Sequence, residues 1–291
     1  MGIPQAQTDT SIDKTTATES RDWLWAIALA AIAFAFRLVP VLRGGGLLGL
    51  GNYDDGVYYA AATGLVHGRL PYQDFLVLHP PGMPLLLAPF ALGAQLTSDS
   101  YGFAAARLAW MLLGAVNALL IWRILRPIGL VAALFGGLGY AVFYRAVYAD
   151  KSTLLECPAT TALLLAIILL QPLVHASSLP RGRAIGAGAL LGFAVTIKVW
   201  GVVSLLIVFA WLLLVGRFRA ALQMIIASAV TAALICLPFF AAAPTTMWHQ
   251  IVRDQVFRRG GKDVAIVGRL DEIVGLGIVG RPHTVITVAA V

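Results

Sequence analysis

Two adjacent carboxylates, Asp54 and Asp55, stand out in a chain of 291 residues that has only 14 acidic residues. A carboxylate can act as a general base and remove the proton of a hydroxyl nucleophile that lies within hydrogen-bond reach. Because like charges side by side raise the pKa of one member, an acid pair suits this role. The alternative is structural: Asp54 would open a helix over residues 54–67, where the helix dipole stabilises a negative charge.

A third acid and a lysine lie at the ends of apolar segments. Glu156 precedes the apolar run 157–175, and Lys198 lies in the sequence TIKVWG. An acid at the edge of the hydrocarbon is costly unless it is paired or hydrated. Glu156 therefore either pairs with Lys151 or Lys198 or orients the hydroxyl groups of a substrate. Lys198 either extends its ammonium group to the membrane surface or binds an anionic ligand as a point charge.

A cationic stretch from Arg253 to Lys262 includes the adjacent Arg258 and Arg259. Arginine binds phosphate oxygens through two parallel hydrogen bonds, which suits an anionic ligand at the membrane surface. Contact with lipid headgroups is the alternative, and the two interpretations overlap if the ligand is a lipid phosphate. The five histidines and two cysteines show no metal-ligand spacing, so we expect neither a metal site nor a cofactor.

The elements that position these residues are expected to be membrane helices. Only 12% of the residues are charged, against about 25% in soluble proteins, so the composition predicts an integral membrane protein. The net charge of +7 does not indicate nucleic-acid binding, because the basic residues mostly lie at the ends of apolar runs. The candidate spans are residues 23–42, 102–122, 128–148, 157–175, 184–199, 200–216, 220–242 and 273–291.

The positions of lysine and arginine predict the orientation of these spans. The basic groups beside them fall on one side of the membrane only if the short, proline-containing run 83–96 does not cross, so we expect a juxtamembrane or re-entrant helix there. The prediction is then a disordered cytoplasmic tail over 1–22 and a transmembrane domain over 23–291, incomplete at its C-terminus. Its outer loops are 43–101 and 243–272, and these hold most of the candidate residues.

The sequence YDDGVYYAAATGLVHGRLPY, followed by HPPG, resembles the first outer loop of membrane-embedded GT-C glycosyltransferases. It is most similar to actinobacterial relatives of the protein O-mannosyltransferase and aminoarabinose-transferase families. In that loop an acid pair is followed by a tyrosine, an Ala–Leu–Gly spacing and a proline pair. The matching positions here are Asp54-Asp55, Tyr58, Ala61, Leu65, Gly68 and Pro80-Pro81, and the family's later acid and lysine fall on Glu156 and Lys198.

The resemblance implies an all-α polytopic fold: a GT-C-like bundle of about seven or eight transmembrane helices with juxtamembrane helices in the first outer loop. It implies a plasma-membrane glycosyltransferase that moves a mannose-like or arabinose-like sugar, with inversion, from polyprenyl phosphate to an extracytoplasmic glycan, lipid or protein hydroxyl. Asp54 and Asp55 would be catalytic. The residues expected to bind substrate are Tyr58, His79, Glu156, Lys198, Arg258 and Arg259.

Two other classes of function are open at this point. One is a transporter or flippase of an anionic lipid or solute, which requires polar residues at mid-membrane depth. The other is a non-catalytic, truncated membrane subunit. The predicted spans hold few ionisable groups near their centres, and the acids gather at one face, which favours chemistry at the membrane surface.

Overall fold

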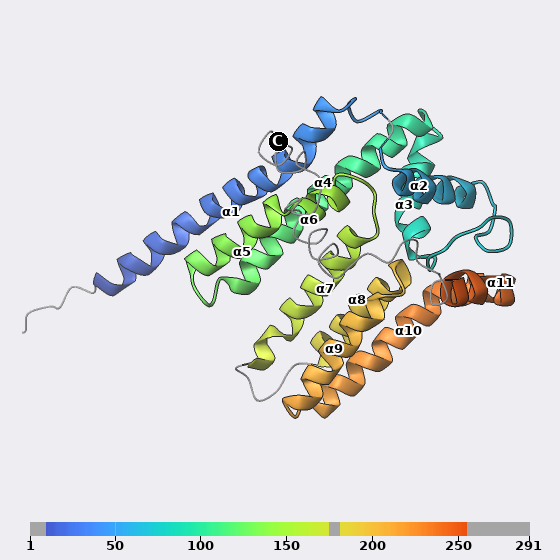
Figure 1. Ribbon diagram of the computed structural model, residues 1–291. Coiled ribbons are helices and arrows are strands. Elements are labelled where there is room, and N and C mark those ends of the chain that lie inside the picture. The colour runs from blue at the N-terminus through green and yellow to red at the C-terminus, as the bar shows by residue number, and fades with distance from the viewer. Residues whose placement is uncertain (1–9, 50, 175–180, 255–291) are drawn as a thin grey trace, which may run out of the picture.

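The computed structural model describes residues 10–49, 51–174 and 181–254 (Figure 1). Every regular element in these ranges is helical, which confirms the predicted all-α class. The elements are α1 (Thr10–Arg43), α2 (Tyr53–Val66), α3 (Gly82–Ala94), α4 (Asp99–Leu125), α5 (Leu130–Val142), α6 (Tyr144–Asp150), α7 (Glu156–Leu170), the 3₁₀-helix η1 (Gln171–Val174), α8 (Arg181–Ile197), α9 (Gly201–Leu214), α10 (Phe218–Ala242), α11 (Pro244–Trp248) and the π-helix η2 (His249–Arg253).

Among the described residues, four helical segments are long and apolar enough to span a membrane: Asp22–Arg43, Asp99–Leu125, Glu156–Leu173 and Phe218–Ala242. A fifth span forms if α5 and α6, which meet at a 60° bend, are taken together. The predicted spans 184–199 and 200–216 correspond to α8 and α9, with 17 and 14 residues. At about 1.5 Å per residue these are shorter than a hydrocarbon core of about 30 Å. The predicted span 273–291 lies outside the described residues.

Close helix packing holds the second half of the bundle together. A Cβ placed on Gly188 would lie 2.2 Å from the carbonyl oxygen of Met224, and one on Gly192 would lie 2.4 Å from that of Ser228. Only glycine therefore allows α8 to approach α10 this closely, as in other small-residue helix contacts in membranes. Leu191 and Leu212 fill the apolar core beside this contact, and neither is exposed.

The segments expected in outer loops gather at one end of the bundle (Figure 1). Helices α2 and α3 lie at the end where α1 finishes and where α10 leads into α11, while the α4–α5 and α9–α10 connections lie at the other end. Helix α3 has 13 residues, about 20 Å, so it is too short to cross alone, in keeping with the predicted juxtamembrane or re-entrant helix.

The structure differs from the prediction at the N-terminus. Helix α1 begins at Thr10, inside the stretch 1–22 that was expected to be disordered. Extending a helix costs much less than starting one, so a membrane span can propagate into the polar residues before it. At the same end, Asp22 accepts a hydrogen bond from Nε of Arg126 at 2.7 Å, which ties the start of the α1 span to the end of α4.

Candidate active site

Four contacts connect the sequence-predicted residues that the structure describes. The rings of Tyr58 and His79 meet edge to face with centroids 5.8 Å apart. The loop that follows His79 reaches Gly82, where an added Cβ would lie 2.6 Å from the carbonyl oxygen of Thr196. Thr196 is two residues before Lys198, so the HPPG turn and the end of α8 are neighbours.

The chain of contacts continues from Lys198 back to the acid pair. Lys198 Nζ lies 2.6 Å from Oε1 of Glu156, and the hydroxyl of Thr153, three residues earlier, donates to the backbone carbonyl of Asp55 at 3.3 Å. The start of α2, the loop before α7, the end of α8 and the HPPG turn therefore meet around one region of the fold.

The two acids of the pair have different surroundings. Asp54 is exposed in the first turn of α2, and its backbone N–H donates to the side-chain oxygen of Asn52, the N-cap residue. The Asn52 amide in turn donates to the hydroxyl of Tyr148. Successive helical residues point about 100° apart, so Asp55 faces inward and none of its surface is exposed. Asp54 therefore does lie at the start of a helix, and this position leaves its exposed carboxylate able to act as a base as well.

Asp55 is a buried acid whose two carboxylate oxygens accept no well-formed hydrogen bond from the described part of the chain. Burial raises the pKa of Asp55 above its ordinary value, and the attraction of Arg107 opposes this. The charge of Asp54 is the smallest contribution to this pKa. Desolvation, rather than the like charge beside it, is therefore the main reason that Asp55 titrates abnormally.

Glu156 and Lys198 form an ion pair, so the pairing with Lys198 that the sequence left open is present and Lys151 is not the partner of Glu156. The side chains are 48% and 31% exposed. A pair this accessible contributes little to stability, but it holds one carboxylate and one ammonium group in a defined place at the end of α7 and α8. Both groups are accessible to a ligand.

Several charged residues of this region were not identified from the sequence as site residues. Arg107 of α4 is 4% exposed and donates to the carbonyls of Leu47 and Gly49. Lys151 lies with its Nζ 5.8 Å from the ring centre of Tyr148, and burial lowers the pKa of Lys151, with the charge of Arg107 adding to the effect.

A buried ion pair joins α1 to α6. Arg37 of α1 pairs with Asp150 at 2.7 Å, and the two side chains are 0% and 1% exposed. The hydroxyl of Tyr140 donates to the same Asp150 oxygen at 3.0 Å. Arg37 and Arg107 each lie inside an apolar run of the sequence. A charged residue at such a position in a membrane protein usually has a buried partner, so this pattern could have identified both arginines.

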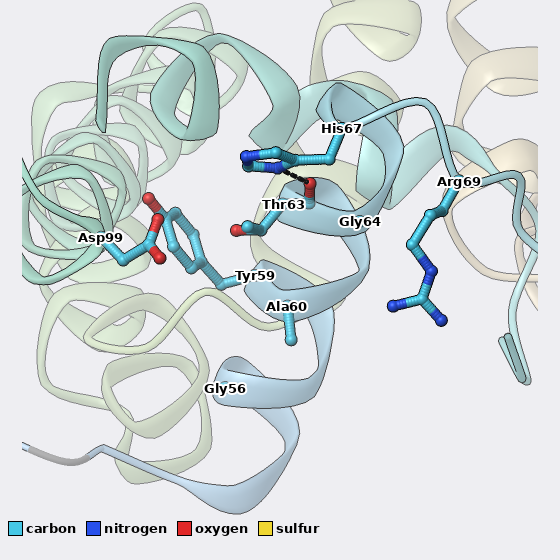
Figure 2. A pocket seen from close by; sticks show the side chains of 8 residues that line it. All are labelled: Gly56, Tyr59, Ala60, Thr63, Gly64, His67, Arg69 and Asp99. Carbon is cyan, nitrogen blue, oxygen red and sulfur yellow. Dashed lines mark hydrogen bonds between the residues drawn. The ribbon is translucent and has the colours of Figure 1, made fainter. Parts of the chain in front are cut away.

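A pocket of about 510 Å³ lies along one face of α2 (Figure 2). With 3.6 residues per helical turn, Asp54 and Tyr58 lie on the opposite face of this helix. It is lined by Gly56, Tyr59, Ala60, Thr63, Gly64, His67, Arg69 and Asp99. In Figure 2 the Tyr59 ring extends toward the Asp99 carboxylate. A hydrogen bond of 2.8 Å joins Nδ1 of His67 to the backbone carbonyl oxygen of Thr63. None of the sequence-predicted site residues lines this pocket.

Two of the predicted residues, Arg258 and Arg259, lie outside the described residues. In the ranges 10–49, 51–174 and 181–254, no three histidine, cysteine or acidic side chains lie close enough to hold a metal ion. The chemistry visible in these ranges is that of carboxylates, ammonium and guanidinium groups at one end of a helical membrane bundle.

The comparisons with known proteins agree with this architecture. The model of glycosyltransferase family 87 matches residues 77–291, well over half of the chain. This range contains His79, Glu156 and Lys198 and begins after the acid pair. No curated protein matches the chain.

A solved structure of similar fold is that of the S. cerevisiae protein O-mannosyltransferase complex bound to the sugar donor. The superposition has a TM-score of 0.57 with 20% sequence identity, and it covers 78% of this chain and 33% of that one. This chain therefore spans about one third of the length of that relative. The shared fold confirms the expected GT-C-like helical architecture, and the family match agrees with the resemblance to membrane glycosyltransferases that the sequence suggested.

Proposed function

Because the chain belongs to glycosyltransferase family 87, we propose that it transfers a sugar from a polyprenyl-phosphate carrier to an acceptor hydroxyl. The sugar is mannose-like or arabinose-like, and the acceptor is a glycan, lipid or protein on the extracytoplasmic side of the plasma membrane. The active site is the region where the start of α2, the loop before α7 and the end of α8 meet. Asp54 is its general base.

The observation that carries this proposal is that Asp54 is exposed, whereas the other acids of the region are either buried or held in ion pairs. Asp55 is fully buried, Asp150 is paired with Arg37, and Glu156 is paired with Lys198. Asp54 can therefore meet a substrate hydroxyl without first breaking an ion pair. Its position in the first turn of α2 fixes the carboxylate at the end of the bundle, where a headgroup and an aqueous acceptor can meet.

The cations of the region are suited to the leaving group. Negative charge builds up on the lipid phosphate as its bond to the sugar breaks, and fixed positive charges lower the energy of that state. Lys198 is accessible beside Glu156, and the half-buried Lys151 has no carboxylate partner among the described residues. We assign phosphate contact to these two lysines, and we assign the orientation of sugar hydroxyls to Glu156, Tyr58 and His79.

The reaction balances without a further co-reactant. The acceptor oxygen attacks the anomeric carbon from the side opposite the phosphate, and its proton passes to Asp54. The new glycosidic bond forms as the bond between the anomeric carbon and the phosphate oxygen breaks, and the electron pair of that bond leaves with the lipid phosphate. A single displacement of this kind inverts the anomeric configuration.

The test is a transfer assay with purified full-length protein, a radiolabelled polyprenyl-phosphate sugar and a glycan acceptor. Asp54→Asn keeps the shape and removes the base, so we expect a loss of roughly 10²- to 10⁴-fold in the rate of transfer. Asp74→Asn is the matched control, because Asp74 is an exposed acid of the same loop whose amide replacement can still accept from the N–H of Leu70, now 2.6 Å away. Full activity of the Asp54→Asn enzyme would rule out the base assignment.

A further inference from the structure

A second pocket, of about 790 Å³, lies between α4, α7 and α8 at the end of the bundle remote from Asp54. It is lined by Trp122, Arg123, Arg126, Pro127, Ile168, Leu169, Gln171, Pro172 and Arg183. The amide of Gln171 donates to the carbonyl of Ile124 at 3.0 Å, which joins η1 to the last turn of α4 and closes one wall. No part of the proposed transfer reaction uses this pocket.

The pocket carries an excess of positive charge. Three arginines line it, and among the described residues the one acid that pairs with them is Asp22, which accepts a hydrogen bond from Arg126. A guanidinium has five N–H donors, so this single bond leaves donors of Arg126 available. Arg123 and Arg183 are exposed and have no hydrogen-bond or ion-pair partner among the described residues.

The helix dipoles strengthen the case for an anion. Arg183 lies in the first turn of α8, where the positive end of the helix dipole disfavours a cation and favours an anion. An anion between Arg183 and Arg123 would relieve that repulsion. Arginine also suits phosphate oxygens because its planar fork can donate two parallel hydrogen bonds.

The other walls of the pocket are apolar. Ile168 and Leu169 belong to the last turns of α7, a membrane span, and Trp122 lies near the end of the α4 span. Tryptophan is typical of the membrane interface. A ligand that fills this pocket would thus meet guanidinium groups on the aqueous side and hydrocarbon on the membrane side.

We propose that this pocket binds the phosphate headgroup of an anionic membrane phospholipid, with Arg123, Arg126 and Arg183 on the phosphate and the acyl chains along α4 and α7. Basic pockets between transmembrane helices bind such headgroups in general. The lipid then bridges the ends of α4 and α8 and stabilises the face of the bundle opposite the transfer site. A soluble phosphate ion shares the same chemistry with the arginines but would gain nothing from the apolar walls.

The test uses the full chain in a neutral detergent, titrated with a short-chain phosphatidylglycerol and followed by native mass spectrometry. Arg123→Gln with Arg183→Gln removes two cations of the pocket. At about fivefold per arginine, we expect roughly 25-fold weaker binding. The matched control is Arg217→Gln with Arg219→Gln, which removes two cations at the α9–α10 connection, on the same end of the bundle but outside the pocket. Its binding should stay within about twofold of the parent protein, with both variants keeping the parent thermal midpoint.

Three results would overturn the proposal. The first is equal weakening in the control variant, which would mean that diffuse surface charge attracts the lipid. The second is no phosphatidylglycerol binding by the parent protein. The third is full displacement of the lipid by inorganic phosphate at an equal concentration, which would make the pocket a site for a soluble anion.

Discussion

The buried ion pair between Arg37 and Asp150 gives the structure its most demanding stability prediction. Asp150→Asn keeps the size and shape of the side chain but removes its charge. Arg37 would then remain fully buried, with its Nε and Nη2 facing a neutral group at the present distances of 3.0 and 2.7 Å. The carbonyls of Ala33 and Ala141, which accept from Nη1, offset only part of the lost attraction.

The magnitude follows from the cost of an uncompensated buried charge. Breaking a buried pair by removing one partner costs about 3–5 kcal/mol. In a chain of this size that loss corresponds to a fall in thermal midpoint on the order of 10 °C. The space around the pair is already full, because a Cβ on Gly114 would lie 2.3 Å from Nε of Arg37 and 2.5 Å from Oδ2 of Asp150. The neighbours therefore cannot easily rearrange to solvate the arginine.

The assay is thermal unfolding of the purified protein in detergent, monitored by intrinsic tryptophan fluorescence. The double variant Arg37→Gln with Asp150→Asn is the control, since it removes both charges and leaves two amides that can hydrogen-bond to each other. We expect it to recover most of the lost stability, because a neutral pair carries no unpaired buried charge. A midpoint for Asp150→Asn within about 2 °C of the parent protein would refute this reasoning, and so would a double variant less stable than the single one.

Two further predictions concern the candidate site. Gly82→Ala places a Cβ 2.6 Å from the carbonyl oxygen of Thr196, so we expect a denaturant titration to show a loss of about 1–3 kcal/mol in the free energy of unfolding. Gly93→Ala is the control, because a Cβ at this position of the same helix meets nothing within 4 Å and should be neutral or slightly stabilising. Equal effects of the two changes would contradict the close contact at Gly82. Burial raises the pKa of Asp55 above 3.8, so its ionised form is disfavoured in the folded protein and stability falls as pH rises above 3.8. Asp55→Asn removes this penalty, so the variant should melt higher than the parent protein at pH 7, and the difference should shrink toward pH 4; a difference that does not change with pH would show that Asp55 is not desolvated as described.

The parts of the site that the sequence predicted are those set by local rules. A helix start at Asp54 and a short helix behind the Pro80-Pro81 pair follow from residue spacing and from the prolines within a few residues. The basic residues at the ends of apolar runs also predicted which loops lie together. The opposite environments of Asp54 and Asp55 follow from helix geometry once the buried face of α2 is known, but the sequence alone did not reveal which face is buried.

The long-range pairs could not be predicted in the same way. Arg37 and Asp150 are 113 residues apart, and no local pattern specifies that α1 and α6 meet. A charge inside an apolar run shows that a buried partner exists without naming it, and Arg107 gave the same signal. The break between α8 and α9 was predicted near residue 200, but the short length of the two helices was not, because adjacent apolar runs have the same composition whether or not each crosses the membrane alone.

The most direct test of the proposed active site is the position of a bound polyprenyl phosphate in an experimental structure of this protein. We predict that its phosphorus lies beside Lys198 and Lys151, with Asp54 facing the space that the sugar and the acceptor hydroxyl would occupy. If the phosphate instead lies only among Arg123, Arg126 and Arg183 at the other end of the bundle, the assignment of Asp54 as the base is wrong.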